Sequence, residues 1–395
     1  MSVTRRSLGA LLAIPALGAP SLARAQGAVI KLGTLTPLTG AGGPYGPVMA
    51  ACVRGVVTQV NAAGGVLGRQ IELVSEDDQT NPEAGVRAAR KLIDVDRVAA
   101  IMGTWASSVT TAVAPLCWEN QVFLTTVSGA DSITLLPHNG WLVRTQPNTT
   151  LQGRKFGEFA VAQGAKRIFV MMPQTPFTQS QFAAMKAAVE AGGGAIELLI
   201  YDATKPSLRT EVDQALRFRP DVIVAGGYTP DTSVLLRDLF RASYSGKILA
   251  FAYAVNQAML TAIPKEVVEG VMTLAPSPAA GSGGYAKVQA LVGTDAPDPY
   301  TCQIYDHVNL VLMAMAKGGA ATGQAVHDTI RKVSQGSGEA VDNALDGLRA
   351  IAAGREVNYE GASGPCDFNE VGDVLDVKFR YEQVKAGALT LIRIA

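Results

Sequence analysis

The chain has 395 residues, of which 48% are hydrophobic and 17% are charged, and its 34 basic side chains balance its 34 acidic ones. This length exceeds what one ordinary hydrophobic core serves, so the sequence predicts two domains. Because there is no net charge to attract nucleic acid or an anionic membrane surface, we expect neither as a partner.

Residues 1–25 have the layout of an export signal. A basic start with Arg5 and Arg6 precedes an apolar stretch, residues 8–17, that is too short to span a bilayer, and small residues at 23–25 suit cleavage. The arginine pair resembles a twin-arginine signal, and general secretion is the alternative route. No cysteine stands directly after the cleavage position, so we expect no lipid anchor. These features predict a mature protein that is free in an oxidising, exported compartment.

After this segment, apolar strands alternate with helical periodicity in two blocks. The first block predicts strands at 29–35, 71–74, 98–102 and 121–127 and helices at 47–60, 82–95 and 107–118. The second predicts strands at 167–172, 195–201, 221–225 and 247–251 and helices at 179–191, 208–218 and 231–242. Helices at 300–315, 323–333 and 341–352 then precede strands at 374–381 and 388–394. Continuous apolar strands between helices are typical of a parallel sheet covered on both faces.

Three segments, 145–148, 274–279 and 358–364, combine proline or glycine with polar residues and are candidate hinges. The predicted fold is therefore α/β, with two doubly wound parallel-sheet lobes joined by a three-crossing hinge. Lobe I takes residues 26–146 and 276–357, and lobe II takes residues 147–275 and 358–395. Two lobes joined in this way can close on a ligand.

In open α/β sheets, ligands bind beyond the carboxyl ends of the strands. The strand at 98–102 runs into Gly103-Thr104-Trp105-Ala106-Ser107-Ser108, where a helix begins. The first N–H groups of a helix lack internal partners and favour negative charge, so this segment suits an anion; a plain helix cap at Ser107 is the alternative. Other strand and helix ends add further candidate ligand-binding residues, namely Tyr45, Ser128, Gly129, Ala130, Phe177, Tyr228, Tyr253 and Tyr300. For each aromatic residue among them, the alternative is a place in the hydrophobic core.

No constellation for catalysis or metal binding stands out. The three histidines are scattered, there is no phosphate-binding loop, and no Gly-x-Ser-x-Gly elbow is present. A dinucleotide fingerprint fails because Tyr45 stands where a third glycine is needed, and Asp77-Asp78 suits a turn better than a metal. We expect no catalytic residue, metal or cofactor, and therefore no enzyme.

The four cysteines match no metal motif in their spacing. In an exported protein one disulfide bond is expected. Cys52 and Cys117 fall on helices predicted to lie on opposite faces of a sheet, so we expect the bond between Cys302 and Cys366.

Four segments resemble the leucine/isoleucine/valine-binding type of periplasmic solute-binding protein that serves ABC importers. They are Leu-Thr-Pro-Leu-Thr-Gly at 35–40, Asn-Ala-Ala-Gly-Gly-Val-Leu-Gly-Arg at 61–69, Glu-Asp-Asp-Gln-Thr-Asn-Pro at 76–82, and the segment 103–108. The likeness covers nearly all of the mature chain and is stronger in the first lobe.

The resemblance implies a type I periplasmic-binding fold and a monomer in the periplasm that captures a small solute between closing lobes. The implied partners are that solute and the permease and ATPase complex at the inner membrane. The alternative is a ligand-sensing receptor of the same fold. A secreted hydrolase is disfavoured because the elbow that it needs is missing.

The resemblance also implies roles for single residues. Ser107 matches the family's carboxylate-binding serine, Ser128 matches a position that acts through its backbone carbonyl, Tyr45 lines the cleft and Tyr300 falls on an aromatic contact.

Three departures bear on the ligand. Ala130 stands where amino-acid binders have threonine, Phe177 stands where the family often has tyrosine, and no acid lies near Ala252 to face an ammonium group. Because burying an unpaired ammonium is costly, we expect an aliphatic or aromatic carboxylate or amide rather than an ordinary branched-chain amino acid. Ser107 and the N–H groups of Ser108 and Ala130 would hold it.

Overall fold

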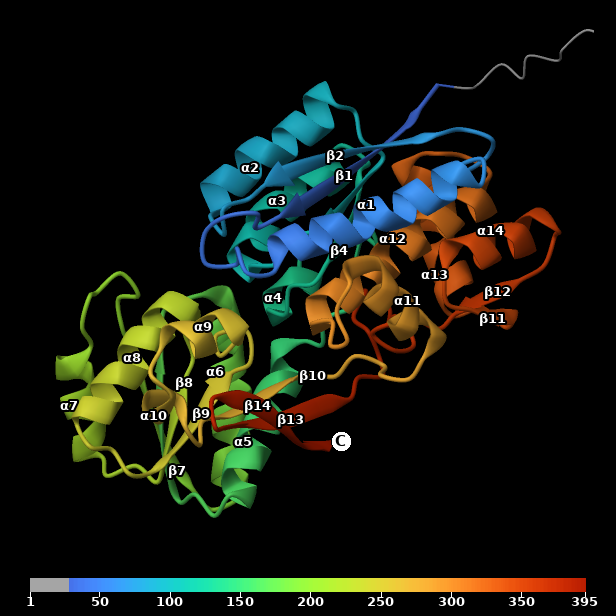
Figure 1. Cartoon of the computed structure of the whole chain (residues 1–395). Helices are drawn as coiled ribbons and strands as arrows, with labels where there is room; N and C mark the ends of the chain where they lie inside the picture. Colours follow the sequence, from blue (N-terminus) through green and yellow to red (C-terminus); the bar gives the residue numbers. More distant parts are fainter. Residues whose placement is uncertain (1–27) are drawn as a thin grey trace, which may run out of the picture.

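A computed structural model describes residues 28–395, so the predicted export signal lies outside the described residues. Each of two lobes is built around its own sheet with helices on both faces, and the chain passes between the lobes near the middle of the molecule (Figure 1). The α/β two-lobe fold expected from the sequence is confirmed. Within the described range, every helix is too short or too polar to cross a membrane.

Lobe I contains five parallel strands in the order β2-β1-β3-β4-β5. They are β1 (Ile30–Thr36), β2 (Ile71–Asp77), β3 (Ala100–Gly103), β4 (Phe123–Thr126) and β5 (Leu142–Arg144). The first helices of the lobe are α1 (Gly46–Ala62), α2 (Pro82–Arg90), which continues as a π-helical turn Lys91–Val95, α3 (Ser107–Glu119) and the short α4 (Asp131–Thr134). The helix α2 packs against α3.

The chain returns to lobe I late in the sequence. This part comprises α11 (Gly283–Val292), α12 (Pro299–Gly318), α13 (Gly323–Ser334) and α14 (Ala344–Ala352), with the short parallel pair β11 (Glu339–Val341) and β12 (Val357–Tyr359). The helix α1 packs against α11, α12 and α14 (Figure 1).

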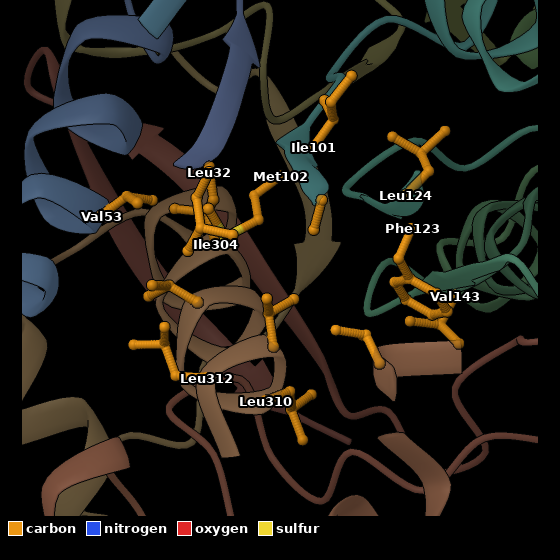
Figure 2. Close-up of a cluster of buried hydrophobic side chains, with 14 of the residues drawn as sticks. Leu32, Val53, Ile101, Met102, Phe123, Leu124, Val143, Ile304, Leu310 and Leu312 are labelled. Atoms are coloured by element: carbon orange, nitrogen blue, oxygen red, sulfur yellow. The ribbon is translucent and has the colours of Figure 1, made fainter. Parts of the chain in front are cut away.

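The helix α12 is the centre of this lobe, because all its residues from 300 to 315 are buried. A helix that is buried all round is mostly apolar, and its buried polar side chains, such as Asp306 and His307, need hydrogen-bond partners. Figure 2 shows Ile304 of α12 beside Leu32 of β1 and Met102 of β3, with Leu310 and Leu312 further along the helix. Each such side chain contributes about 1.5–3 kcal/mol when fully buried.

Lobe II contains a seven-stranded sheet in the order β14-β13-β10-β9-β8-β6-β7. Its parallel part is β6 (Arg167–Met172), β7 (Ala195–Ile200), β8 (Val222–Ala225), β9 (Lys247–Phe251) and β10 (Met272–Pro276). Its helices are α5 (Thr149–Ala162), α6 (Pro176–Ala191), α7 (Arg209–Arg217), α8 (Thr229–Arg241), α9 (Gln257–Ala262) and α10 (Lys265–Val268).

The edge of this sheet departs from the purely parallel arrangement that the sequence predicts. The strands β13 (Phe379–Lys385) and β14 (Ala388–Ile394) are antiparallel, and β13 pairs antiparallel with β10. The two strands are joined by Ala386 and Gly387, which have φ values of +53° and +80°. Two consecutive residues with positive φ are the connection typical of a tight antiparallel hairpin.

The third crossing between the lobes lies later than the sequence predicts. The residues Tyr359 to Phe368 contribute to the buried cluster of lobe I, not to lobe II. Asp306 of α12 anchors them, accepting the hydroxyl of Tyr359 at 2.8 Å and the N–H of Ala362 at 2.7 Å. A buried carboxylate needs such donors, and this loop supplies them. The crossing therefore falls at 374–378, and the expected lobe boundary at 357/358 needs this correction.

The three crossings meet in one place. Residues from all three, Thr145, Ser277 and Val377, line one small void. The N–H of Ser277 donates to the carbonyl of Lys378 at 2.7 Å, which joins the second crossing to the third. Thr145 of the first crossing is 2.8 Å from Nε2 of His307 on α12. Burial lowers the pKa of His307 to about 3, so this contact involves a neutral imidazole.

Candidate functional site

The turn that follows β3 is shaped by a glycine that no other residue can replace without strain. Gly103 has φ +119°, and a Cβ there would lie 2.6 Å from the carbonyl oxygen of Leu35. Thr104 continues in the left-handed region with φ +52°. Only glycine adopts the first of these conformations readily, and the turn aims the following residues at the edge of the sheet.

Buried hydroxyl groups hold this turn in place. The hydroxyl of Thr126 donates to the carbonyl of Thr104 at 2.7 Å, and the hydroxyl of Ser128 lies 2.8 Å from the same oxygen. Ser128 is only 1% exposed and does not line the cavity described below. Its hydroxyl therefore holds the backbone of the turn and does not face the cavity.

The amino terminus of α3 carries no side-chain cap. The N-cap residue is Ala106, and Ser107 is the first residue of the helix, so Ser107 does not cap its own helix. Its Oγ instead accepts the N–H of Ala130 at 3.1 Å. No side chain or carbonyl among residues 28–395 accepts the hydrogen of this hydroxyl. The helix end therefore presents free N–H groups together with one free O–H donor, an arrangement suited to an anionic or carbonyl oxygen.

An aromatic cluster joins the two lobes beside this helix end. The indole of Trp105 lies 5.6 Å from the ring of Tyr45 in lobe I, and 5.4 Å and 5.6 Å from the rings of Tyr228 and Tyr253 in lobe II. Tyr300, at the start of α12, is 5.7 Å away. The Tyr45 hydroxyl also donates to the carbonyl of Tyr253 at 3.0 Å. Such ring pairs contribute about 0.5–1.5 kcal/mol each beyond their burial, so the cluster favours a closed arrangement.

The cavity between the lobes is small and uncharged. Its void is about 20 Å³, and it is lined by Trp105, Ala106, Ser107, Val127, Gly129, Gln146, Phe177, Tyr228, Tyr253 and Tyr300. That volume suits about one water molecule, so a solute enters only when the lobes separate or the rings move. None of these side chains is an acid or a base.

Most of the residues predicted from the sequence come together here. Tyr45 stacks on Trp105 and does not itself line the void. Ser108 follows Ser107 on the helix and does not line the void either. The N–H of Ala130, which we expected to hold the ligand, is bonded to Ser107 instead.

The sequence prediction missed Ala106, Val127 and Gln146. Gln146 lies in the predicted hinge at 145–148. A hinge that passes close to the carboxyl ends of the strands places its residues near the ligand, and this reasoning could have identified Gln146.

Acidic residues near the site position the aromatic side chains. Asp231 accepts the hydroxyl of Tyr201 at 2.6 Å and the backbone N–H of Tyr228 at 3.0 Å. Asp298 caps α12 and accepts the N–H of Tyr300 at 2.9 Å. Burial raises the pKa of both carboxyl groups.

Burial also raises the pKa of the phenols in the cluster, those of Tyr45, Tyr228, Tyr253 and Tyr300. These hydroxyl groups therefore stay neutral over the physiological range, and the walls of the cavity offer hydrogen bonds without charge.

All four cysteines are buried free thiols, so the expected bond between Cys302 and Cys366 is not formed in the structure. The thiol of Cys366 points to the carbonyl of Gly364 at 3.7 Å, and Cys302 is buried within α12. Burial raises the pKa of both thiols and keeps them protonated.

Comparison with known proteins agrees with the family resemblance found in the sequence. The family model described as "Periplasmic binding protein" matches residues 29–373. The chemotactic signal transduction system substrate-binding protein BasB of Halobacterium salinarum is 29% identical over 359 residues, covering 86% of this chain and 84% of the relative. The Leu/Ile/Val-binding protein BraC3 of Rhizobium johnstonii is 25% identical over 367 residues, covering 91% and 93%.

Among solved structures, the leucine binding protein LivK of Thermotoga maritima superposes with a TM-score of 0.79 at 23% identity, covering 93% of this chain and 98% of that one. The members of this family and the relatives named above are binding proteins, not enzymes. The chain belongs to the periplasmic binding protein family and is of the leucine/isoleucine/valine-binding type with the type I fold.

Proposed function

We propose that this protein is the periplasmic substrate-binding component of an ABC importer, and that its solute is a carboxylate or amide on an apolar or aromatic body. The observation that carries the ligand class is the combination of an uncapped α3 end, a free Ser107 hydroxyl and cavity walls without charge. The amino-terminal sequence with Arg5-Arg6 supports export.

The helix end and Ser107 suit the polar head of such a solute. Free backbone N–H groups and the helix dipole stabilise a negative oxygen, and a hydroxyl that already accepts one bond is left to donate its hydrogen. The aromatic rings of Trp105, Tyr228 and Tyr253 suit an apolar body. An α-ammonium group would lose its hydration here and gain no acid in return.

A ligand panel built from matched pairs tests this proposal. Leucine is compared with 4-methylpentanoate, phenylalanine with 3-phenylpropanoate, and 3-phenylpropanoate with 3-phenylpropanamide. The members of each pair then differ in the ammonium group or the head group alone. Thermal shift ranks them, and mass spectrometry of the protein as purified identifies any solute carried along. We expect the acids or amides to bind more tightly than the amino acids. Tight leucine binding with no response to 4-methylpentanoate would overturn the ligand class.

A sensing role is the second candidate, favoured by the name of the Halobacterium salinarum relative. Uptake of the radiolabelled solute, measured with and without the gene, separates the two roles. Loss of uptake supports transport, whereas unchanged uptake with a lost behavioural response supports sensing. Amino-terminal sequencing of the exported protein tests cleavage after Ala25.

A further inference from the structure

Arg144 is a fully buried arginine at the end of β5, directly before the first crossing between the lobes. Its side chain is 0% exposed and is the largest of the fully buried side chains. A guanidinium group stays charged under all ordinary conditions, and burying it is costly unless it is paired and hydrogen-bonded. Its partners therefore indicate what this position is for.

The guanidinium donates in three directions. Its Nε donates to Oδ1 of Asp373 at 2.7 Å, its Nη1 to the carbonyl of Ala130 at 2.6 Å, and its Nη2 to Oγ1 of Thr134 at 3.0 Å. The backbone N–H of Arg144 also donates to the carbonyl of Gly372 at 2.9 Å.

One end of this set reaches the candidate ligand site. Ala130, whose carbonyl Arg144 holds, is the residue whose N–H donates to Oγ of Ser107 at 3.1 Å. That bond leaves the Ser107 hydroxyl hydrogen free for a ligand. Holding Ala130 therefore fixes the orientation of Ser107.

The other end reaches the hinge. Asp373 directly precedes the third crossing at 374–378, and its Oδ2 accepts Nδ2 of Asn148 at 3.3 Å. Asn148 belongs to the first crossing and caps α5 of lobe II by accepting the N–H of Leu151 at 2.8 Å. Two of the three crossings therefore meet at a carboxylate bonded to Arg144.

We propose that Arg144 is a positioning residue that joins the hinge to the ligand site: it holds Ala130, and through it Ser107, in the orientation set by Asp373 and the crossings. A change at the hinge then reaches the ligand site through a single side chain. The significance of Ser107 rests on the proposed function, but the geometric link does not, so it is tested without a ligand.

The test is hydrogen–deuterium exchange of the mature protein, followed over residues 127–134. The variants are Arg144→Lys, which keeps the charge but cannot make three directed donations, and Asp373→Asn, which keeps the shape and removes the charge at the hinge. Lys287→Met is the matched control, because Lys287 pairs with Asp342 at 2.9 Å in the same lobe away from this set.

We expect exchange of residues 127–134 to rise at least about tenfold in both variants and to stay at the wild-type rate in Lys287→Met, with the core strands β1 and β3 unchanged. The response to Asp373→Asn is decisive, since Asp373 does not touch Ala130 or Ser107. Asp373→Glu, which restores the carboxylate, should recover part of the protection.

Unchanged exchange at 127–134 in folded Asp373→Asn would overturn the proposal. A uniform rise over all of lobe I would also overturn it, because that would show general stabilisation without positioning. If Arg144→Lys fails to fold, the Asp373 variants still decide. If no acid or amide binds in the panel, the proposed function fails while this result stands.

Discussion

Gly129→Ala is expected to obstruct closure of the lobes without disturbing either lobe by itself. Gly129 lies in lobe I after β4, and a Cβ added there would be 2.8 Å from Nε2 of Gln152 and 2.9 Å from Cε2 of Phe177. Both obstacles belong to lobe II, on α5 and α6. Gly129 is not among the residues with positive φ, so alanine suits its backbone.

The magnitude follows from this geometry. Carbon atoms prefer separations of about 3.5–4.0 Å, so the ring of Phe177 must retreat by more than about 0.5 Å or the lobes must stay apart. Overpacking of this kind costs about 1–3 kcal/mol. At about 1.4 kcal/mol per tenfold change, the closed state and the ligand affinity should fall by about 5- to 150-fold.

Small-angle scattering of the protein with and without 4-methylpentanoate measures closure, and calorimetry measures affinity. The matched control is Gly55→Ala in α1, whose new methyl would meet only the side chain of Leu291, within the same lobe. We expect Gly129→Ala to remain open at probe concentrations that close the wild type, with a melting temperature near the wild-type value, and Gly55→Ala to close normally. Wild-type closure and affinity in Gly129→Ala would refute the reasoning.

Three further predictions follow, of which two concern the same site and one concerns a buried acid in lobe I. Ser107→Ala should weaken binding of a carboxylate probe by about ten- to a hundredfold in calorimetry, since a hydrogen bond to a charged group is worth about 1.5–3 kcal/mol, and an unchanged affinity would contradict the role of its hydroxyl. Tyr45→Phe removes the hydrogen bond to Tyr253 across the lobes, worth about 1 kcal/mol, so scattering should show more of the open form, whereas an unchanged profile would mean that the rings alone hold the lobes together. Burial raises the pKa of Asp78 to about 7, and its Oδ2 has no partner among the described residues. Because this folded-state pKa lies above the unfolded value, the contribution of protonated Asp78 to stability is fully present below about pH 4 and is lost, by about 4 kcal/mol, as the pH rises to about 7. Asp78→Asn should remove this part of the pH dependence of the melting temperature. A pH profile parallel to that of the wild type would contradict the assignment.

The sequence was sufficient for features that depend on local pattern. Apolar runs at strand length between helical repeats indicated the parallel sheets, and Gly103 followed by hydroxyl residues indicated the turn that opens α3. These features follow from backbone conformation and from burial periodicity, both of which are readable from neighbours along the chain. The aromatic lining was indicated by the ends of the predicted strands and helices, and the resemblance added the family and the roles expected for Ser107, Tyr45 and Tyr300.

Tertiary structure decided what depends on residues far apart in the chain. Ser107 bonds to Ala130, 23 positions away in the sequence, instead of capping its helix. The hydrogen bond that joins the lobes links Tyr45 to Tyr253, 208 positions apart. The ion pair between Arg144 and Asp373, which connects the hinge to the site, joins residues 229 positions apart. The third crossing is placed by Asp306, a buried carboxylate that recruits the loop after β12 into lobe I. Periodicity reports which residues are buried, but it does not report which polar groups meet once they are buried. That pairing is enforced by the cost of leaving a charge or an N–H without a partner in the interior, and it is settled only when distant segments pack together.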